Sequence, residues 1–208
     1  TQVYALSLVT AAVGRIYALD VAGKGVTATP ISYTALADVT VSAVANATET
    51  WTSVAHGMAT GDGPYRLTNA GGGLPTGSAV DTNYWIIRLT ADTFRLATTY
   101  ALAMALDPLL ISSDGTGTHT VQRDANDVIV AWLVDRLNAV VGKNYTAVQT
   151  SGAGDTDTIT VTATAAGDWF SLAVQDLTSI ASAQTHADPG VETDLTAIRL
   201  ESSDWYVL

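Results

Sequence analysis

One stretch determines how the chain is organised: residues 51–100, WTSVAHGMATGDGPYRLTNAGGGLPTGSAVDTNYWIIRLTADTFRLATTY, with their continuation to residue 121. Short runs that alternate between apolar and polar residues are separated by glycine-rich loops, a pattern typical of strands joined by turns. The strands are predicted near residues 50–55, 63–68, 83–90, 93–98 and 116–122. Residues 100–110 contain ALAMAL and predict one or two helical turns that end at Pro108. The stretch therefore reads as a self-contained β unit.

The flanking sequence has its own pattern of strands, helix and strands. Before the β unit, strands are predicted at residues 3–10, 15–21 and 29–34 as an antiparallel meander, followed by a strand at 38–44 that leads into the unit. After it, the apolar residues Ile129, Trp132, Leu133, Leu137 and Val140 recur at helical spacing and predict a helix over 127–141, with Asp124 as its N-cap. Further strands are predicted at 145–150, 158–164 and 169–174, and a last helix at 192–202.

These patterns predict an α+β fold interrupted by an insertion. Residues 1–40 and 123–208 form the expected host domain, a two-layer antiparallel sheet with the helix at 127–141 as its one main cover. Residues 41–122 form the expected inserted domain, which is mainly β. Insertions of this size are tolerated at loops, because the entropy cost of closing a loop rises only slowly with its length.

The composition favours a protein that meets other proteins. The 208 residues carry 9 basic and 20 acidic side chains, a formal net charge of −11, which disfavours nucleic acid and anionic membrane surfaces as partners. Only 14% of the residues are charged, against about 25% in an average globular protein. Thr, Ser, Ala and Gly must therefore cover much of the surface. The chain has no cysteine, so disulfides and thiolate chemistry are excluded.

The sequence does not predict a metal or cofactor site. His56, His119 and His186 are each isolated from other ligands at metal-binding spacing, although His56 and His119, at the two ends of the β unit, are a pair that folding can bring together. The Asp155-Thr156-Asp157 loop lacks the rest of a calcium-binding pattern and is read as a solvated hairpin loop. The glycines of AGGG at 70–73 lack the GK[ST] ending of a phosphate-binding loop.

The sequence also argues against an enzyme. It contains no G-x-S-x-G motif, and Ser182, His186 and Asp188 lie on one short polar segment, whereas a catalytic triad converges from separate elements. No small-molecule substrate is expected. Trp132 and Trp169 lie in apolar patterns and are predicted to be core residues. Trp51, Trp85 and Trp205 are left open. If the insertion is a carbohydrate- or receptor-binding module, its exposed platform for surface contact is expected to be Trp51, Tyr65, Tyr84 and Trp85.

Two parts of the sequence resemble virion proteins of tailed bacteriophages. The segments AHGMATGDGPYRLT (55–68), GGGLPTGSAVDTNYWIIRLTADTFRLATT (71–99) and DGTGTHTV (114–121) resemble a β module common in phage virion proteins. The flanking segments TPISYTALADVT (29–40), VAWLVDRLNAVVG (130–142), YTAVQTSGAGDTDTITVTATAAGDWFSLAV (145–174) and DLTAIRLESSDWYVL (194–208) resemble a domain of contractile-tail sheath proteins.

This resemblance implies a structural virion protein, made in the host cytoplasm and located in the virion tail. It would be an outward-facing part of the tail sheath that packs around the tail tube, and DWYVL lies where sheath chains continue. The implied partners are other copies of the chain and neighbouring virion subunits. The polymerising core and linking arms of sheath proteins have no counterpart in this sequence. The alternatives are another virion component, such as a tail tube, decoration or adaptor protein, and a carbohydrate- or receptor-binding module.

Overall fold

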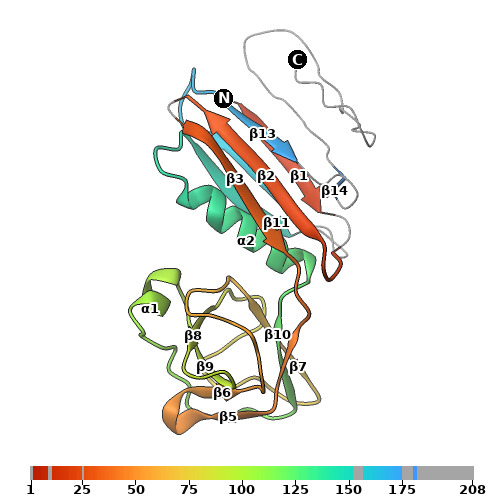
Figure 1. Cartoon of the computed structure of the whole chain (residues 1–208), viewed down its shortest axis with the longest axis vertical. Coiled ribbons are helices and arrows are strands. Elements are labelled where there is room, and N and C mark those ends of the chain that lie inside the picture. Colours follow the sequence, from red (N-terminus) through yellow and green to blue (C-terminus); the bar gives the residue numbers. More distant parts are fainter. Residues whose placement is uncertain (1, 9–10, 25, 152–156, 175–179, 182–208) are drawn as a thin grey trace. The chain divides into compact units, whose positions relative to one another are not determined.

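The computed structural model describes residues 2–8, 11–24, 26–151, 157–174 and 180–181, in which the chain divides into two compact units (Figure 1). Unit 1 comprises Thr1–Ala35 and Ala125–Leu208, and unit 2 comprises Leu36–Asp124. The sequence-based boundaries at 41 and 122 lie just inside the ends of unit 2. All strand pairs described are antiparallel and helices are few, so the fold is α+β or mainly β. The helix expected at 192–202 lies outside the described residues.

The described strands of unit 1 form two sheets. They are β1 (Val3–Leu8), β2 (Ile16–Gly23), β3 (Val26–Thr34), β11 (Tyr145–Ser151), β12 (Asp157–Ala163), β13 (Phe170–Val174) and β14 (Ile180–Ala181). One sheet has the order β11-β12-β1-β14 and the other the order β13-β2-β3. Sequence periodicity placed the longer strands correctly to within a few residues.

The predicted meander of the first three strands is wrong at its first step. β2 and β3 do form a hairpin, but β1 pairs with β12 and β14 instead of β2. Residues 9–15 separate β1 from β2, a length greater than the two-residue turns that join neighbouring strands most tightly. β12 instead offers a full ladder, from Val3 opposite Thr162 to Leu8 opposite Asp157. A long-range ladder of this kind cannot be read from local turn signals.

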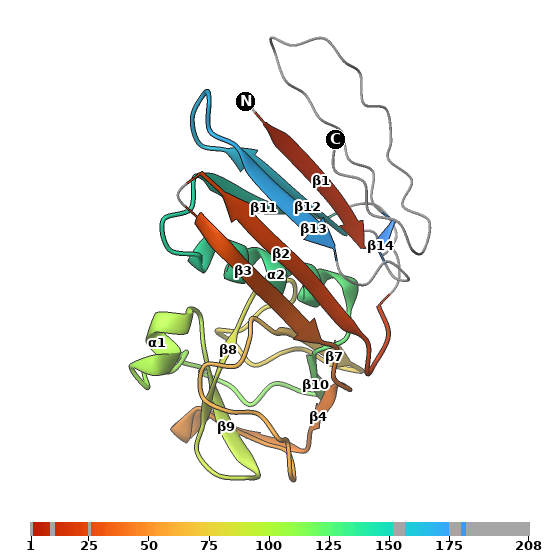
Figure 2. The same ribbon diagram turned by 45° about the horizontal axis from the view of Figure 1, so that its top comes forward.

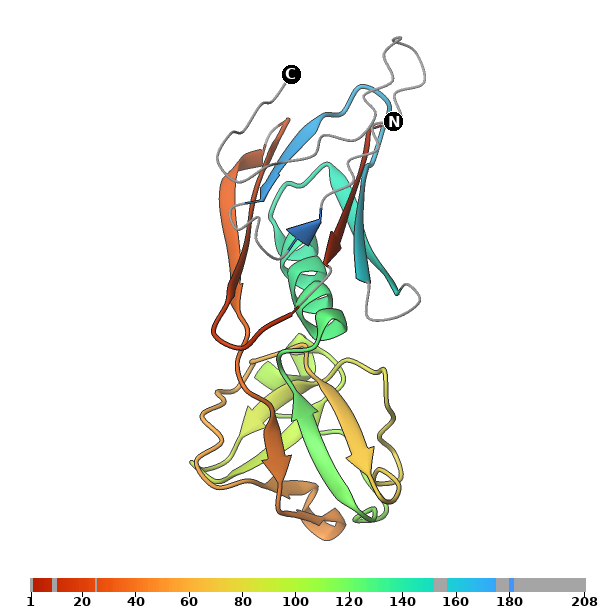
Figure 3. The ribbon, with the colours of Figure 1, turned by 90° about the vertical axis from the view of Figure 1, so that its right-hand side faces the viewer.

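Helix α2 (Asn126–Ala139) lies between the two sheets of unit 1. It contacts β11 and β12 of one sheet and β3 of the other, and Figure 3 shows the green helix with strands on both sides. Its buried residues, Val128, Ile129, Val130, Ala131, Leu133 and Leu137 among them, are not confined to one stripe. A helix that is apolar nearly all round requires cover on several sides. The expected N-cap is also corrected, because Ala125 occupies that position without a side-chain hydrogen bond.

The side chain of Gln2 joins the two sheets of unit 1. Its Nε2 donates to the carbonyl oxygen of Phe170 at 2.8 Å and its Oε1 accepts the N–H of Phe170 at 2.9 Å. The backbone oxygen of Gln2 accepts the N–H of Ala163, next to the ladder of β1 and β12. One residue thus connects the β1–β12 sheet to β13, which runs near β1 in Figure 2.

Unit 2 consists of short strands, two short helices and long loops. Its elements are β4 (Val39–Val41), β5 (Ala43–Ala45), η1 (Asn46–Thr48), β6 (Thr50–Thr52), β7 (Arg66–Ala70), β8 (Trp85–Arg88), β9 (Thr93–Ala97), α1 (Tyr100–Met104) and β10 (Thr118–Gln122). The strands form one sheet of order β4-β10-β7 and another of order β5-β6-β9-β8. The strand predicted at 38–44 is therefore split into β4 and β5, and residues 100–110 contain a single short helix.

The glycine-rich loop of unit 2 packs against the loop before β10. A Cβ on Gly77 would lie 2.4 Å from the carbonyl oxygen of Leu110, and one on Gly117 would lie 2.4 Å from that of Ala70. Both glycines also have positive φ, at 107° and 82°. These backbones approach closely only because the side chains are absent. Gly77 and Gly117 are thus required by packing.

The burial of Tyr145 predicts a response of unit 1 to alkaline pH. Its side chain is fully buried, its hydroxyl donates to the carbonyl oxygen of Leu137 at 3.0 Å, and burial raises its pKa to about 12. The unfolded chain ionises near the ordinary pKa of about 10. The stabilising contribution is therefore fully present below pH ~10 and is lost as the pH rises to about 12, by up to about 2–3 kcal/mol.

Urea unfolding of the wild type and of Tyr145→Phe between pH 8 and pH 12 measures this difference. The variant should be less stable by about 1 kcal/mol at pH 8, because the carbonyl of Leu137 loses its donor. It should then lose less stability than the wild type above pH ~10. Parallel decline of the two proteins over this range would contradict the assignment.

The division into two units predicts that unit 1 folds without unit 2. Replacing residues 36–124 with a short Gly/Ser linker should give a protein with β and helical circular dichroism and a cooperative thermal transition, because α2 and its two sheets are retained. The cost of closing a short replacement loop is small. A product without cooperative melting would show that unit 2 is required for the fold of unit 1.

Candidate functional site

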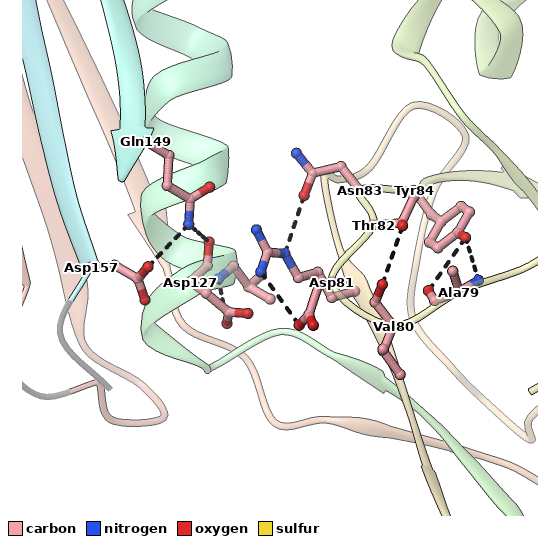
Figure 4. Close-up of polar contacts among 11 residues, drawn as sticks. Ala79, Val80, Asp81, Thr82, Asn83, Tyr84, Asp127, Gln149 and Asp157 are labelled. Carbon is pink, nitrogen blue, oxygen red and sulfur yellow. Dashed lines mark hydrogen bonds and ion pairs between the residues drawn. The ribbon is translucent and has the colours of Figure 1, made fainter. Parts of the chain in front are cut away.

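The four aromatic residues predicted to form an exposed platform are buried in unit 2. Trp51, Tyr65, Tyr84 and Trp85 are between 1 and 8% exposed, so the platform prediction is wrong. Tyr65 and Tyr84 exchange two backbone hydrogen bonds of 2.8 Å, and the Tyr84 hydroxyl accepts the N–H of Ala79 at 2.9 Å (Figure 4). Trp51 lies in β6 and Trp85 in β8, strands of three and four residues, which are too short for alternation to show which side chains are buried.

The ring of Trp51 forms the centre of a series of aromatic contacts. It stacks on Phe94 with 6.4 Å between ring centroids, and its other neighbour, His119, lies edge-on at 5.8 Å. Phe94 in turn contacts the ring of His56 at 5.2 Å. Trp51 and Phe94 thus link the two histidines from the ends of the inserted unit through successive ring contacts. These rings belong to the core of unit 2.

Hydrogen bonds hold one ring nitrogen of His56 and both ring nitrogens of His119. His56 Nδ1 accepts the backbone N–H of Met58 at 3.0 Å. His119 Nδ1 lies 2.8 Å from the amide nitrogen of Asn69, and its Nε2 lies 3.2 Å from the carbonyl oxygen of Asp114. Within the described part of the chain no three His, Asp or Glu residues gather as metal ligands. His186 lies outside that part.

The acidic loop after β11 contributes one described residue, Asp157. This residue is 5% exposed, and its carboxylate accepts a 3.4 Å hydrogen bond from the Gln149 amide, which also donates to the carbonyl oxygen of Asp127 (Figure 4). Asp157 is therefore engaged inside unit 1 and is not a solvated loop residue. Asp155 and the Ser182-His186-Asp188 set lie outside the described residues.

The neck of unit 2, defined as Ala37, Asp38, Arg123 and Asp124, contains two neighbouring carboxyl groups. Arg123 donates its backbone N–H to Asp38 Oδ1 at 2.7 Å, and its guanidinium donates to the carbonyl oxygen of Ala37. Partial desolvation raises the pKa of the Asp38 carboxyl, and repulsion from Asp124 adds to this rise. The contacts hold the first and last residues of unit 2 together.

An exposed apolar surface lies instead on α1 and the loop that follows it. We define the α1 surface as Tyr100, Met104, Leu106 and Leu110, which are all at least 45% exposed. The Thr99 hydroxyl caps the helix by accepting the N–H of Leu102, and Ala103 is buried on the opposite side with Trp85 and Ile87. The helix thus anchors one face in the core and presents large apolar side chains on the other.

The exposed apolar residues of the α1 surface are concentrated within eleven positions of sequence, 100–110. Scattered exposed hydrophobic residues need no explanation, whereas grouped ones mark contact sites for other molecules. The sequence motif ALAMAL indicated a helix there, but it did not distinguish buried from exposed positions. Asp107 is the one charged residue of the segment.

A small void in unit 1 has a mainly apolar lining, made by Leu6, Ser7, Leu8, Leu19, Val130, Leu133 and Ile159. Among the described helices none is long and apolar enough to span a bilayer. Comparison of the chain with protein-family models, curated proteins and solved structures gave no match.

Trp169 provides a second correction, because this predicted core residue is 55% exposed. It stands just before β13, where the alternation of apolar residues does not continue into the loop. Trp132, by contrast, packs on Tyr33 with a centroid distance of 5.1 Å and lies beneath the guanidinium of Arg136.

The contrast between Trp51 and Trp169 can be measured as stability. Trp51→Ala should destabilise unit 2 by about 3–5 kcal/mol, because it removes the central ring of the aromatic series. Trp169→Ala is the matched control and should change the free energy of unfolding by about 0.5 kcal/mol or less. Chemical denaturation of both variants tests this, and equal losses would contradict the assigned positions.

Proposed function

We propose that this chain is a structural virion protein, an outward-facing part of a phage tail sheath that packs around the tail tube. The observation that carries the proposal is the agreement of two independent boundaries. The segments that resemble a phage virion module lie within residues 55–121, and the compact unit 2 spans Leu36–Asp124. The segments that resemble sheath proteins fall mainly on unit 1.

The chemistry of the surface supports an assembly role. The chain has few charged residues and a surface rich in small polar and apolar side chains, which suits contacts that are individually weak and repeated in a symmetric array. The α1 surface offers large apolar side chains to a protein neighbour, either another copy or a different virion subunit. Asp107 is the one charged residue in the segment 100–110 that carries this surface, so contacts made there would be mainly apolar.

The proposal keeps α2 as the main covering helix of unit 1. In place of the expected two layers, the helix is enclosed between the sheet β11-β12-β1-β14 and the sheet β13-β2-β3. Such a unit would act as a rigid platform, with unit 2 as a decoration or as a contact to the neighbouring subunit.

Labelling of virions tests the assigned location. Antibodies raised against unit 2 should bind along the whole length of the contractile tail at regular spacing, because sheath subunits repeat along the tube. In reconstructions of such tails by electron cryomicroscopy, both units should fit density outside the tube. Label confined to the capsid or the tail tip would overturn the sheath assignment and favour a decoration or adaptor protein.

Substitutions on the α1 surface test its role in assembly. The double change Leu106→Ser and Leu110→Ser should reduce incorporation into particles at least about ten-fold while leaving the melting temperature nearly unchanged, because both side chains are exposed. Val54→Ser is the matched control, since Val54 is 78% exposed in the same unit but outside the α1 surface. Equal incorporation of both variants and the wild type would show that assembly does not use this surface.

A further inference from the structure

Strand β11 is an outer strand of its sheet, and alternate residues turn their backbone groups away from the sheet. The N–H of Thr164 donates to the carbonyl oxygen of Asn144. This bond shows which alternate residues of β11 form backbone hydrogen bonds with β12. Residues 146, 148 and 150 therefore bond to β12, whereas Tyr145 and Ala147 point their N–H and C=O groups outward. An outer edge of this kind normally offers a template for another strand.

The amide of Asn138 occupies the outward backbone groups of Ala147. Asn138 Nδ2 donates to the carbonyl oxygen of Ala147 at 2.8 Å, and Asn138 Oδ1 accepts the N–H of Ala147 at 3.1 Å. One donor and one acceptor in this arrangement reproduce the pair of hydrogen bonds that a residue of a neighbouring strand would make. Lys143 Nζ also donates to the outward carbonyl oxygen of Tyr145, at 3.2 Å.

The outer edge of the second sheet is interrupted by different chemistry. The N–H of Ala35 donates to the carbonyl oxygen of Arg15. The backbone N–H and C=O groups of residues 31 and 33 in β3 therefore point toward β2, and those of residues 30, 32 and 34 point outward. Pro30 therefore stands at an outward position, where it has no N–H to offer. Gln2 makes the same amide pair with Phe170 as Asn138 makes with Ala147, at the junction of the two sheets.

We propose that Asn138 is a strand mimic that closes the outer edge of β11 against pairing with the β11 edge of a second copy of this chain. The second copy is the relevant partner because a two-fold axis brings the same strand of two copies together antiparallel, with each Ala147 donating to the other strand. The side chain projects from α2, which contacts β11, so the edge is closed whenever the helix is in place. This inference does not depend on the proposed role in a virion.

A purely structural role for Asn138, fastening α2 to β11, predicts loss of stability without self-association. The variant Asn138→Ala separates the two roles, because alanine retains helix propensity while it removes both hydrogen bonds. Asn144→Ala is the matched control: it removes an amide that donates to the carbonyl oxygen of Trp169, away from the outer edge of β11.

Three measurements on the full chain test the proposal. Light scattering after size exclusion should show concentration-dependent dimers for Asn138→Ala and monomers for Asn144→Ala. A fluorescent peptide with the β11 sequence YTAVQTS should bind Asn138→Ala at least about ten-fold more tightly than the wild type. Hydrogen exchange by NMR in dilute, monomeric samples should show about ten-fold faster exchange of the Ala147 amide in that variant. Monomers at every concentration, with unchanged peptide binding, would overturn the proposal.

If Asn138→Ala does not fold, a measurement on the wild type alone tests whether Asn138 closes the edge of β11. The backbone N–H of Ala147 points away from β12, so its hydrogen-bond acceptor is the Oδ1 atom of Asn138. Slow exchange of this N–H in the folded protein therefore requires Asn138. Exchange of this amide at the rate of an unstructured peptide would show that the edge is not closed, and the proposal would fail.

Discussion

The structure of unit 1 depends on the need to bury a helix that is apolar on nearly every side. Val128, Ile129, Val130 and Leu133 of α2 face in different directions around the helix axis, and each is at most 2% exposed. One flat sheet covers only one face of a helix, whereas two sheets enclose it. The division of the strands into β11-β12-β1-β14 and β13-β2-β3 follows from this requirement. Polar contacts then fix the helix, from the Tyr145 hydroxyl to Leu137 and from the Asn138 amide to Ala147.

Unit 2 forms its buried core without a long helix. Its short strands cannot supply a wide apolar face, so single large rings fill the core, with Trp51 between Phe94 and His119. The loops around this core pack closely at glycine positions such as Gly77 and Gly117. This use of aromatic residues leaves few of them for the surface. The exposed apolar side chains of unit 2 are therefore mostly aliphatic, and the largest group of them lies on α1 and its following loop.

The sequence predicted the local structure far better than the pairing of the strands or the burial of single residues. Alternation within a strand and helical spacing in α2 are properties of neighbouring residues, so they located most elements. The partner of β1 depends on a ladder to residues more than 140 positions away, for which no local signal exists. The prediction of an exposed aromatic platform was wrong for a related reason. The identity of a residue such as Trp51 or Tyr84 does not show whether its side chain is buried or exposed. The glycines of the loops were noticed, but their role depends on backbones that approach from elsewhere in the chain.

The edges and faces of the units limit how this protein can meet a neighbour. Pairing through strand edges depends little on side chains, because backbone groups are the same at every residue, so it discriminates poorly between partners. Asn138 at β11 and Pro30 at β3 interrupt the edges formed by the longest outer strand of each sheet in unit 1. Side chains on exposed faces differ from one position to the next, so contacts made through them can be selective. In the proposed assembly role, interrupted edges and the apolar surface on α1 would together favour contact with a defined neighbour. The two features are located in different units, so each can change without disturbing the core that supports the other.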